Sequence, residues 1–177
     1  MSRPSDPAPA LDGHRVRLRP VRPDDTDVLR SILVDPSVAR WWGPPRPDVD
    51  AADDWLDIDA DTTQWTIELD GTVIGGIQLA EEADPDYRHG GVDLFLAPGA
   101  QGQGLGPDAV RTVARWAFEA RGHHRLTIDP SAANERAIRA YGSVGFRPVG
   151  RMRAYERGPD GAFHDGLLMD LLRDELR

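Results

Sequence analysis

The chain has 177 residues, of which 40% are hydrophobic and 29% are charged, and its formal net charge is −9. This length suits one domain with a sizeable core, and the composition is typical of a soluble globular protein. The absence of cysteine excludes disulfides, thiolate metal sites and a cysteine nucleophile, and no apolar run approaches the ~20 residues of a membrane span.

The N-terminal residues 1–13 are polar and rich in proline, with no hydrophobic core of a signal peptide. We therefore expect a flexible arm over 1–13, a single domain over 14–177, and a cytoplasmic protein.

Hydrophobic periodicity predicts alternating strands and helices in the first half of the chain. Strands are expected at 14–21, in two runs within 64–80, and at 90–97, and helices at 24–35 and 48–60. The two runs within 64–80 flank Asp70-Gly71, which is a strong signal for a β-hairpin turn.

The second half is predicted to contain one β-α-β crossover and a closing hairpin. Residues 104–121 and 132–144 are expected to be helices, and 124–129 a strand. The segment 146–172 is predicted to be a long hairpin that turns at Pro159-Asp160-Gly161. The order of elements indicates an α+β fold with a β-α-β unit at its centre.

The distribution of charge is uneven. Every basic residue is arginine, and the interval between Arg46 and Arg88 holds thirteen acids and no basic residue. These acids are consistent with a solvated surface, or with a field that attracts a cationic substrate. Nucleic acid is a poor partner for such a surface. The five histidines show no metal-ligand spacing, so we expect no metal.

Three glycines, Gly102, Gly104 and Gly106, stand at alternate positions before the helix at 104–121. Glycine lets backbone N–H groups approach a ligand, and a helix N-terminus favours anions, so the loop suits phosphates. A Walker loop is excluded because it needs lysine, and Pro107 breaks the dinucleotide-binding pattern. The loop taken alone is also consistent with a turn that binds nothing.

Two blocks of sequence resemble a known family. Gln101-Gly102-Gln103-Gly104-Leu105-Gly106 matches Gln/Arg-x-x-Gly-x-Gly/Ala, and "NERAIRAYGSVGF" (134–146) matches the block that follows it. On these motifs the chain resembles the GNAT superfamily of N-acetyltransferases. The resemblance implies a mixed, mostly antiparallel twisted sheet of six to seven strands, about four helices, and a central β-α-β unit that binds acetyl-CoA.

Within this superfamily the chain is most similar to aminoglycoside 6'-N-acetyltransferases. The similarity lies in "RWWG" (40–43), "GVDLFLA" (91–97) and "IDPSAANERAIRAY" (128–141). Ribosomal-protein N-terminal acetyltransferases begin with a segment similar to "VRLRPVRPDD" (16–25) and also end with a closing hairpin.

The resemblance assigns a set of residues to acetyl-CoA binding. They are Leu94, Phe95, Leu96, Gln101, Gly102, Gln103, Gly104, Leu105, Gly106, Asn134, Ala137 and Tyr141. Two departures from the pattern are expected to matter. Pro107 removes one N–H donor, and Asp108 places a negative charge near the pyrophosphate, which should weaken binding.

The resemblance also implies roles at the acceptor. Tyr141 would protonate the leaving thiolate, and Asp93 would bind the acceptor amine and act as its base. Asp129 is expected to contact the acceptor, and Trp41 and Trp42 to wall its pocket. Without the resemblance, Tyr141 reads as a core aromatic, Asp93 as a solvated strand residue and Asp129 as a turn cap.

The expected function is transfer of an acetyl group from acetyl-CoA to a primary amine of a cationic small molecule, the 6'-amine of an aminoglycoside, as in antibiotic resistance. Two alternatives stay open: acetylation of a (ribosomal) protein N-terminus, and a non-catalytic acyl-CoA-binding module. We expect acetyl-CoA as the co-substrate with no metal, neither nucleic acid nor membrane as a partner, and a monomer or homodimer.

Overall fold

The computed structural model describes residues 8–42, 55 and 61–177. Within these residues eight strands form one sheet: β1 (Leu11–Asp12), β2 (Arg17–Pro20), β3 (Thr62–Leu69), β4 (Thr72–Glu82), β5 (His89–Leu96), β6 (Arg125–Ile128), β7 (Arg147–Arg157) and β8 (Phe163–Leu172). The helices are α1 (Thr26–Leu33), α2 (Pro36–Ala39), α4 (Leu105–Glu119) and α5 (Glu135–Val144), with single 3-10 turns at Pro23–Asp25, Pro98–Ala100 and Arg173–Glu175. None of these helices combines the length and apolar character needed to cross a membrane.

The strands follow the spatial order β1-β2-β3-β4-β5-β6-β8-β7, and every neighbouring pair is antiparallel except β5 and β6. The parallel pair is joined through α4, so the predicted β-α-β crossover is confirmed. The α+β class and the mostly antiparallel mixed sheet are confirmed as well. The predicted helix at 48–60 lies outside the described residues, apart from Trp55, which is buried.

The sheet has one strand more than the six to seven expected. The additional strand, β1, lies inside the segment expected to be an arm, and it pairs Leu11 with Leu18. The indole N–H of Trp65 also donates to the carbonyl of Pro9 at 2.8 Å. A strand of two residues is too short to show a periodic pattern, which is why the sequence did not predict β1.

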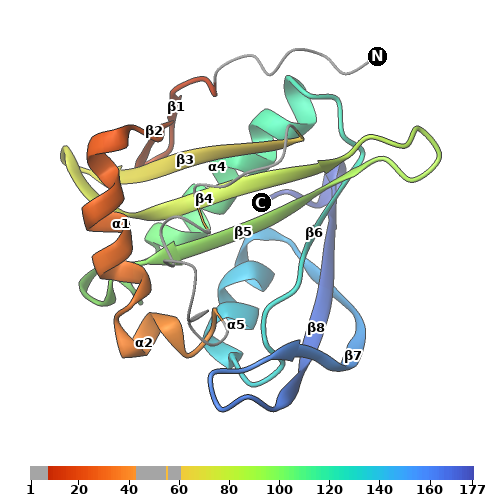
Figure 1. Cartoon of the computed structure of the whole chain (residues 1–177). Helices are drawn as coiled ribbons and strands as arrows, with labels where there is room; N and C mark the ends of the chain where they lie inside the picture. Colours follow the sequence, from red (N-terminus) through yellow and green to blue (C-terminus); the bar gives the residue numbers. More distant parts are fainter. Residues whose placement is uncertain (1–7, 43–54, 56–60) are drawn as a thin grey trace.

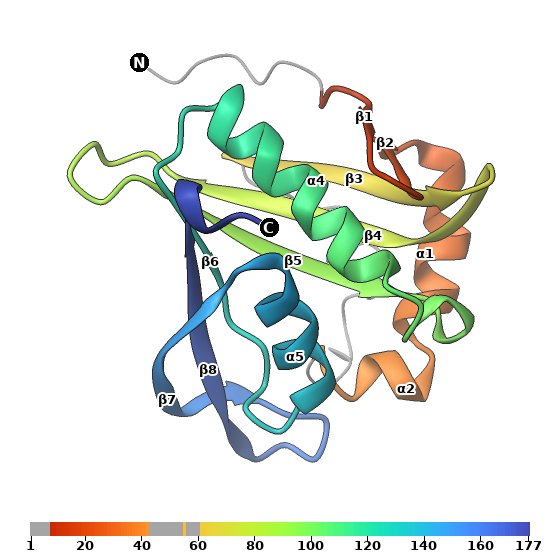
Figure 2. The ribbon, with the colours of Figure 1, turned by 180° about the vertical axis from the view of Figure 1, so that it is seen from behind.

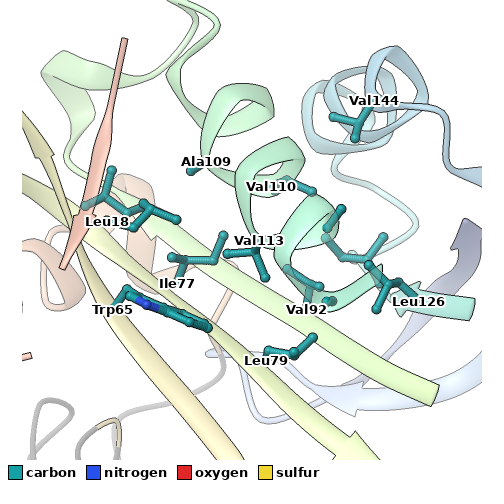
Figure 3. Packing of buried hydrophobic residues seen from close by; sticks show 14 of the residues in the cluster. Leu18, Trp65, Ile77, Leu79, Val92, Ala109, Val110, Val113, Leu126 and Val144 are labelled. Atoms are coloured by element: carbon teal, nitrogen blue, oxygen red, sulfur yellow. The ribbon is translucent and has the colours of Figure 1, made fainter. Parts of the chain in front are cut away.

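Helices cover both faces of the sheet. In Figure 1 α1 and α2 lie in front, and the view from behind in Figure 2 shows α4 and α5 on the opposite face. Figure 3 shows Val113 of α4 beside Ile77 of the sheet, and Ala109, Val110 and Val92 belong to the same buried cluster. The spacing of the apolar residues in α4 places them on one face of the helix, which buries them against the strands.

Strands β5 and β6 pair over a short distance only. Their register contains two pairs, Gly90 with Leu126 and Gly91 with Thr127. Beyond Gly91 the two strands diverge, as the view in Figure 1 shows. The C-terminal half of β5, from Val92 to Leu96, therefore pairs with β4 on one side and faces a gap between strands on the other.

Asp108 in the first turn of α4 ties this helix to the N-terminal segment. Its carboxylate accepts the backbone N–H groups of His14 at 3.0 Å, Arg15 at 2.7 Å and Val16 at 3.0 Å. Burial alone would raise the pKa of Asp108, but these three donors outweigh burial and lower it. The carboxylate is buried and turned onto residues 14–16, so its hydrogen bonds go to the N-terminal segment and not to the glycine loop. The expected weakening of anion binding by its charge stays a prediction.

We predict that Asp108→Asn destabilises the fold by about 2 kcal/mol or more, since a buried N–H group that loses its acceptor costs about 1–3 kcal/mol. Urea unfolding followed by circular dichroism measures this loss. Asp86→Asn is the control, because Asp86 is an exposed residue of the β4–β5 turn. Equal stability of the two variants would contradict the role given to Asp108.

Candidate active site

Two adjoining cavities open where β5 and β6 diverge. The larger has a volume of about 600 Å³ and is lined by three carboxylates, and we call it the acidic cavity. The smaller, of about 360 Å³, lies between the glycine loop and α5, and we call it the loop cavity. Five residues line both cavities and mark where they meet: Trp41, Trp42, Leu94, Asn134 and Tyr141.

The glycine loop forms one wall of the loop cavity. Gly102 and Gly104 have φ values of 75° and 80°, which an L-residue adopts only with strain. Gln101 holds the loop in place, because its side-chain amide donates to the Leu96 carbonyl at 2.8 Å. On the other side, the Arg15 guanidinium donates to the Gln103 carbonyl at 2.7 Å.

Most of the residues assigned to acetyl-CoA line the loop cavity. They are Leu94, Phe95, Leu96, Gln101, Gly102, Gly104, Gly106, Asn134, Ala137 and Tyr141. Gln103 and Leu105 are not among the lining residues. The Leu105 side chain is fully buried in the core, and the Gln103 side chain donates to the Gly99 carbonyl. Leu105 can therefore offer a ligand only its backbone, whereas the Gln103 amide is engaged within the loop itself.

The loop cavity is suited to an anion. Helix α4 begins after Gly104, and the first N–H groups of a helix have no partner within it. Pro107 is the third residue of α4, so the N–H that it lacks belongs to this unpartnered set and costs no internal hydrogen bond.

Sequence reasoning missed two arginines on the opposite wall. Arg136 and Arg139 of α5 line the loop cavity, and they bring positive charge to it in a chain without lysine. Their spacing of three places them on one side of the helix, a signal that the sequence contained.

Helix α5 brings two predicted residues to the junction of the cavities. Asn134 caps the helix, with its side-chain oxygen accepting the Ala137 N–H at 3.2 Å. Tyr141 lies two turns later on the same side. Burial, and then the charges of Asp93 and Asp129, raise the pKa of Tyr141, so its hydroxyl keeps its proton and can act as a donor.

Asp93 projects from β5 into the acidic cavity. Val92 packs in the core under α4 while Phe95 packs with α1, so the predicted alternation of faces along β5 is confirmed. Burial, and then the charge of Asp129, raise the pKa of Asp93 to about 6, although the Gln78 side chain donates to it at 3.3 Å. A carboxyl group that titrates near neutral pH is suited to accepting a proton.

Asp129 lies at the end of β6 and also lines the acidic cavity. Sequence reasoning missed its two neighbours there, Tyr155 and Glu156 of β7. The Tyr155 hydroxyl donates a hydrogen bond to Asp129. This bond, followed by burial, raises the pKa of Tyr155 to about 12. Burial, and then the charges of Asp129 and Asp93, raise the pKa of Glu156. No local pattern pointed to these residues, because they arrive from a distant strand.

Trp41 and Trp42 follow α2 and wall both cavities. The Trp42 ring packs edge-on against Phe95 and Trp55, each with its centroid 5.5 Å away. Phe95 is itself buried, so it offers the loop cavity mainly its backbone. In the parts of the chain that the structure describes, no three His, Asp or Glu side chains gather closely enough to hold a metal ion.

Comparison with known proteins identifies relatives along most of the chain. The family model "Acetyltransferase (GNAT) domain" matches residues 15–147. The aminoglycoside N(6')-acetyltransferase type 1 of Klebsiella pneumoniae is 31% identical, over 82% of this chain and 79% of the relative. The spermidine N(1)-acetyltransferase of Escherichia coli K12 is 25% identical, over 92% of this chain and 88% of the relative.

A solved structure of AAC(6')-Ib with paromomycin and acetyl-CoA superposes on this chain with a TM-score of 0.74 and 27% identity. The match covers 91% of this chain and 95% of that structure. The shared architecture therefore extends over nearly the whole of both chains.

The electrostatic coupling in the acidic cavity predicts a specific titration. Asp93 should titrate near pH 6, and Asp129→Asn should lower this midpoint toward the usual aspartate range, because it removes the charge that opposes ionisation of Asp93. Carboxyl ¹³C NMR of the protein labelled at aspartate measures the midpoint. Asp86→Asn should leave it in place; a midpoint that Asp129→Asn does not lower would show that the two carboxyls are uncoupled.

Proposed function

The chain belongs to the GNAT acetyltransferase family, and on this premise we propose that it acetylates a primary amine of a polycationic small molecule, the 6'-amine of an aminoglycoside. The observation that carries this proposal is the acidic cavity, where Asp93, Asp129 and Glu156 lie beside the loop cavity. Three carboxylates in one cavity favour an acceptor with several ammonium groups. The two relatives, an aminoglycoside N(6')-acetyltransferase and a spermidine N(1)-acetyltransferase, support this class of acceptor.

Acetyl-CoA fits the loop cavity as the acetyl donor. Its pyrophosphate would lie on the N–H groups at the start of α4, with Arg136 and Arg139 on the other side. Its thioester would lie beside Leu94–Leu96, the stretch of β5 that faces the gap between strands. A backbone N–H of this stretch would then donate to the thioester oxygen as negative charge develops there.

The proposed reaction uses the groups that meet between the two cavities. Asp93 accepts a proton from the acceptor ammonium, and the free amine attacks the carbonyl carbon of the thioester. The carbon–nitrogen bond forms and leaves one extra proton on the nitrogen, and the carbon–sulfur bond breaks as Tyr141 donates its proton to the departing thiolate. The proton that the nitrogen loses on becoming an amide then returns to the Tyr141 phenolate, while the proton on Asp93 passes to solvent. The raised pKa values of Asp93 and Tyr141 suit these roles, because each group begins in the protonation state that its role requires near pH 7.

If the protein acetylated the N-terminus of another protein, the donor site would be the same and only the acceptor would differ. A peptide α-amine carries one cation, and among the described residues Arg157 is the one arginine that lines the acidic cavity, so one of the three carboxylates would be left without a counter-charge. The acyl-CoA-binding module would need neither Asp93 nor Tyr141. The three carboxylates therefore favour the small polycation over both alternatives.

An acceptor panel tests the proposal. Purified protein is supplied with acetyl-CoA and kanamycin, spermidine, or a peptide with a free N-terminus, and thiol release is followed over time. We expect saturable release with kanamycin and a product acetylated at the 6'-amine by mass spectrometry and NMR. Release with the peptide alone would favour N-terminal acetylation, and calorimetric binding of CoA without turnover on any amine would favour the binding module.

Tyr141→Phe tests the proton donor. Loss of a general acid typically costs 10²–10⁴-fold in rate, so we expect kcat to fall at least about 100-fold while the Kd for CoA changes little. Tyr87→Phe is the matched control, because Tyr87 is 75% exposed on the β4–β5 turn. Full activity in Tyr141→Phe would remove Tyr141 from the mechanism.

A further inference from the structure

Strand β7 carries an irregularity beside the acidic cavity. Met152 pairs with Gly166, and the next pair is Glu156 with His164. Between these two pairs β7 advances by four residues while β8 advances by two. Within this bulge Ala154 has a φ of 48°, which is uncommon for a residue other than glycine. Bulges of this kind re-aim side chains, and backbone strain concentrates at functional sites.

Asp165 of β8 holds the bulge in shape. One of its carboxylate oxygens accepts the Ala154 N–H at 2.9 Å, and the other accepts from the Arg151 guanidinium at 3.1 Å. Its backbone carbonyl accepts the Ala132 N–H at 2.8 Å, which ties β8 to the segment after Asp129. The strained conformation is therefore fixed by contacts on two sides.

The bulge aims Tyr155 at Asp129. The Tyr155 ring lies over Gly166, where an added Cβ would come within 2.8 Å of the ring atom Cδ1. With the ring seated there, its hydroxyl donates to Oδ2 of Asp129. Three features, the bulge, the clamp by Asp165 and the glycine under the ring, thus converge on one hydrogen bond.

We propose that Tyr155 is a positioning residue that fixes the Asp129 carboxylate as the binding site for a second ammonium group of the acceptor. This inference rests on the proposed function and deepens it, because it divides the carboxylates between two tasks. Asp93 takes the proton of the reacting amine, whereas Asp129, already engaged by a hydroxyl donor, binds a remote cation. The cavity then prefers diamines to monoamines of the same length.

The kinetic test compares a diamine with a monoamine of equal chain length, with acetyl-CoA as donor. Tyr155→Phe should raise KM for the diamine about tenfold, the loss expected for a hydrogen bond to a charged group. Tyr155→Phe should change the KM for the monoamine, and kcat for both acceptors, by less than about twofold, because a monoamine has no second ammonium group for Asp129 to bind. Tyr87→Phe serves as the control for loss of a tyrosine hydroxyl.

A double-mutant cycle separates positioning from a general structural effect. In the Asp129→Asn background, Tyr155→Phe should raise the diamine KM no further, because the carboxylate that it positions is gone. An equal rise in both backgrounds would overturn the proposal. Gly166→Ala, which displaces the ring but keeps the hydroxyl, should reproduce the rise in diamine KM; an unchanged KM in this variant would also count against it.

A measurement without acceptor keeps this inference distinct from the proposed function. In the free protein at pH 8, Tyr155→Phe should shift the Asp129 carboxyl ¹³C resonance and leave that of Asp86 in place. If the resonance shifts but no amine is acetylated, the proposed function fails while the contact stands. If the Asp129 resonance does not move, the positioning role is refuted whatever the acceptor.

Discussion

The separation of β5 from β6 is the constraint on which the rest of the site depends. The two strands are parallel neighbours for two residue pairs and then part. If β5 and β6 paired along their whole length, the edge of β5 would be buried and both cavities would be closed. Because the strands diverge, the edge of β5 beside Leu94 meets the N-terminal ends of α4 and α5, and side chains from β7 reach the same space. Each group assigned to the reaction lies along this opening.

The two cavities divide the work by charge. Among the residues that the structure describes, the loop cavity contains helix N–H groups and two arginines, whereas the acidic cavity contains three carboxylates and one arginine, Arg157. An anionic donor and a cationic acceptor would thus enter from opposite sides and meet at Tyr141. The net charge of −9 would favour a cationic acceptor, and the Asp108 carboxylate at the start of α4 is bound by three backbone N–H groups.

Local patterns in the sequence predicted the parts of the fold that local forces determine. The alternation along "GVDLFLA" placed Asp93 on the correct face, the Asp70-Gly71 pair marked the β3–β4 hairpin, and the glycines before α4 marked the loop cavity. The resemblance supplied what periodicity could not, namely the pairing of Asn134 with Tyr141 as cavity residues.

The remaining features depend on contacts that are distant in the chain. Asp108 receives N–H groups 92 to 94 residues away, and Tyr155 reaches an aspartate 26 residues away. No spacing rule connects such positions, so the sequence did not predict the contact of Asp108 with residues 14–16 or the contact of Tyr155 with Asp129. Strand β1 was missed because two residues are too few to show a period, and the bulge at Ala154 was missed because its sequence reads as an ordinary strand.

The clamp between Asp108 and residues 14–16 has a practical consequence for work with this protein. The same segment donates its N–H groups to Asp108, and its Arg15 side chain donates to the Gln103 carbonyl, so residues 14–16 support the glycine loop. Removal of residues 14–16 would take away both the donors to Asp108 and the Arg15 contact to Gln103, so it would disturb the glycine loop at one wall of the loop cavity.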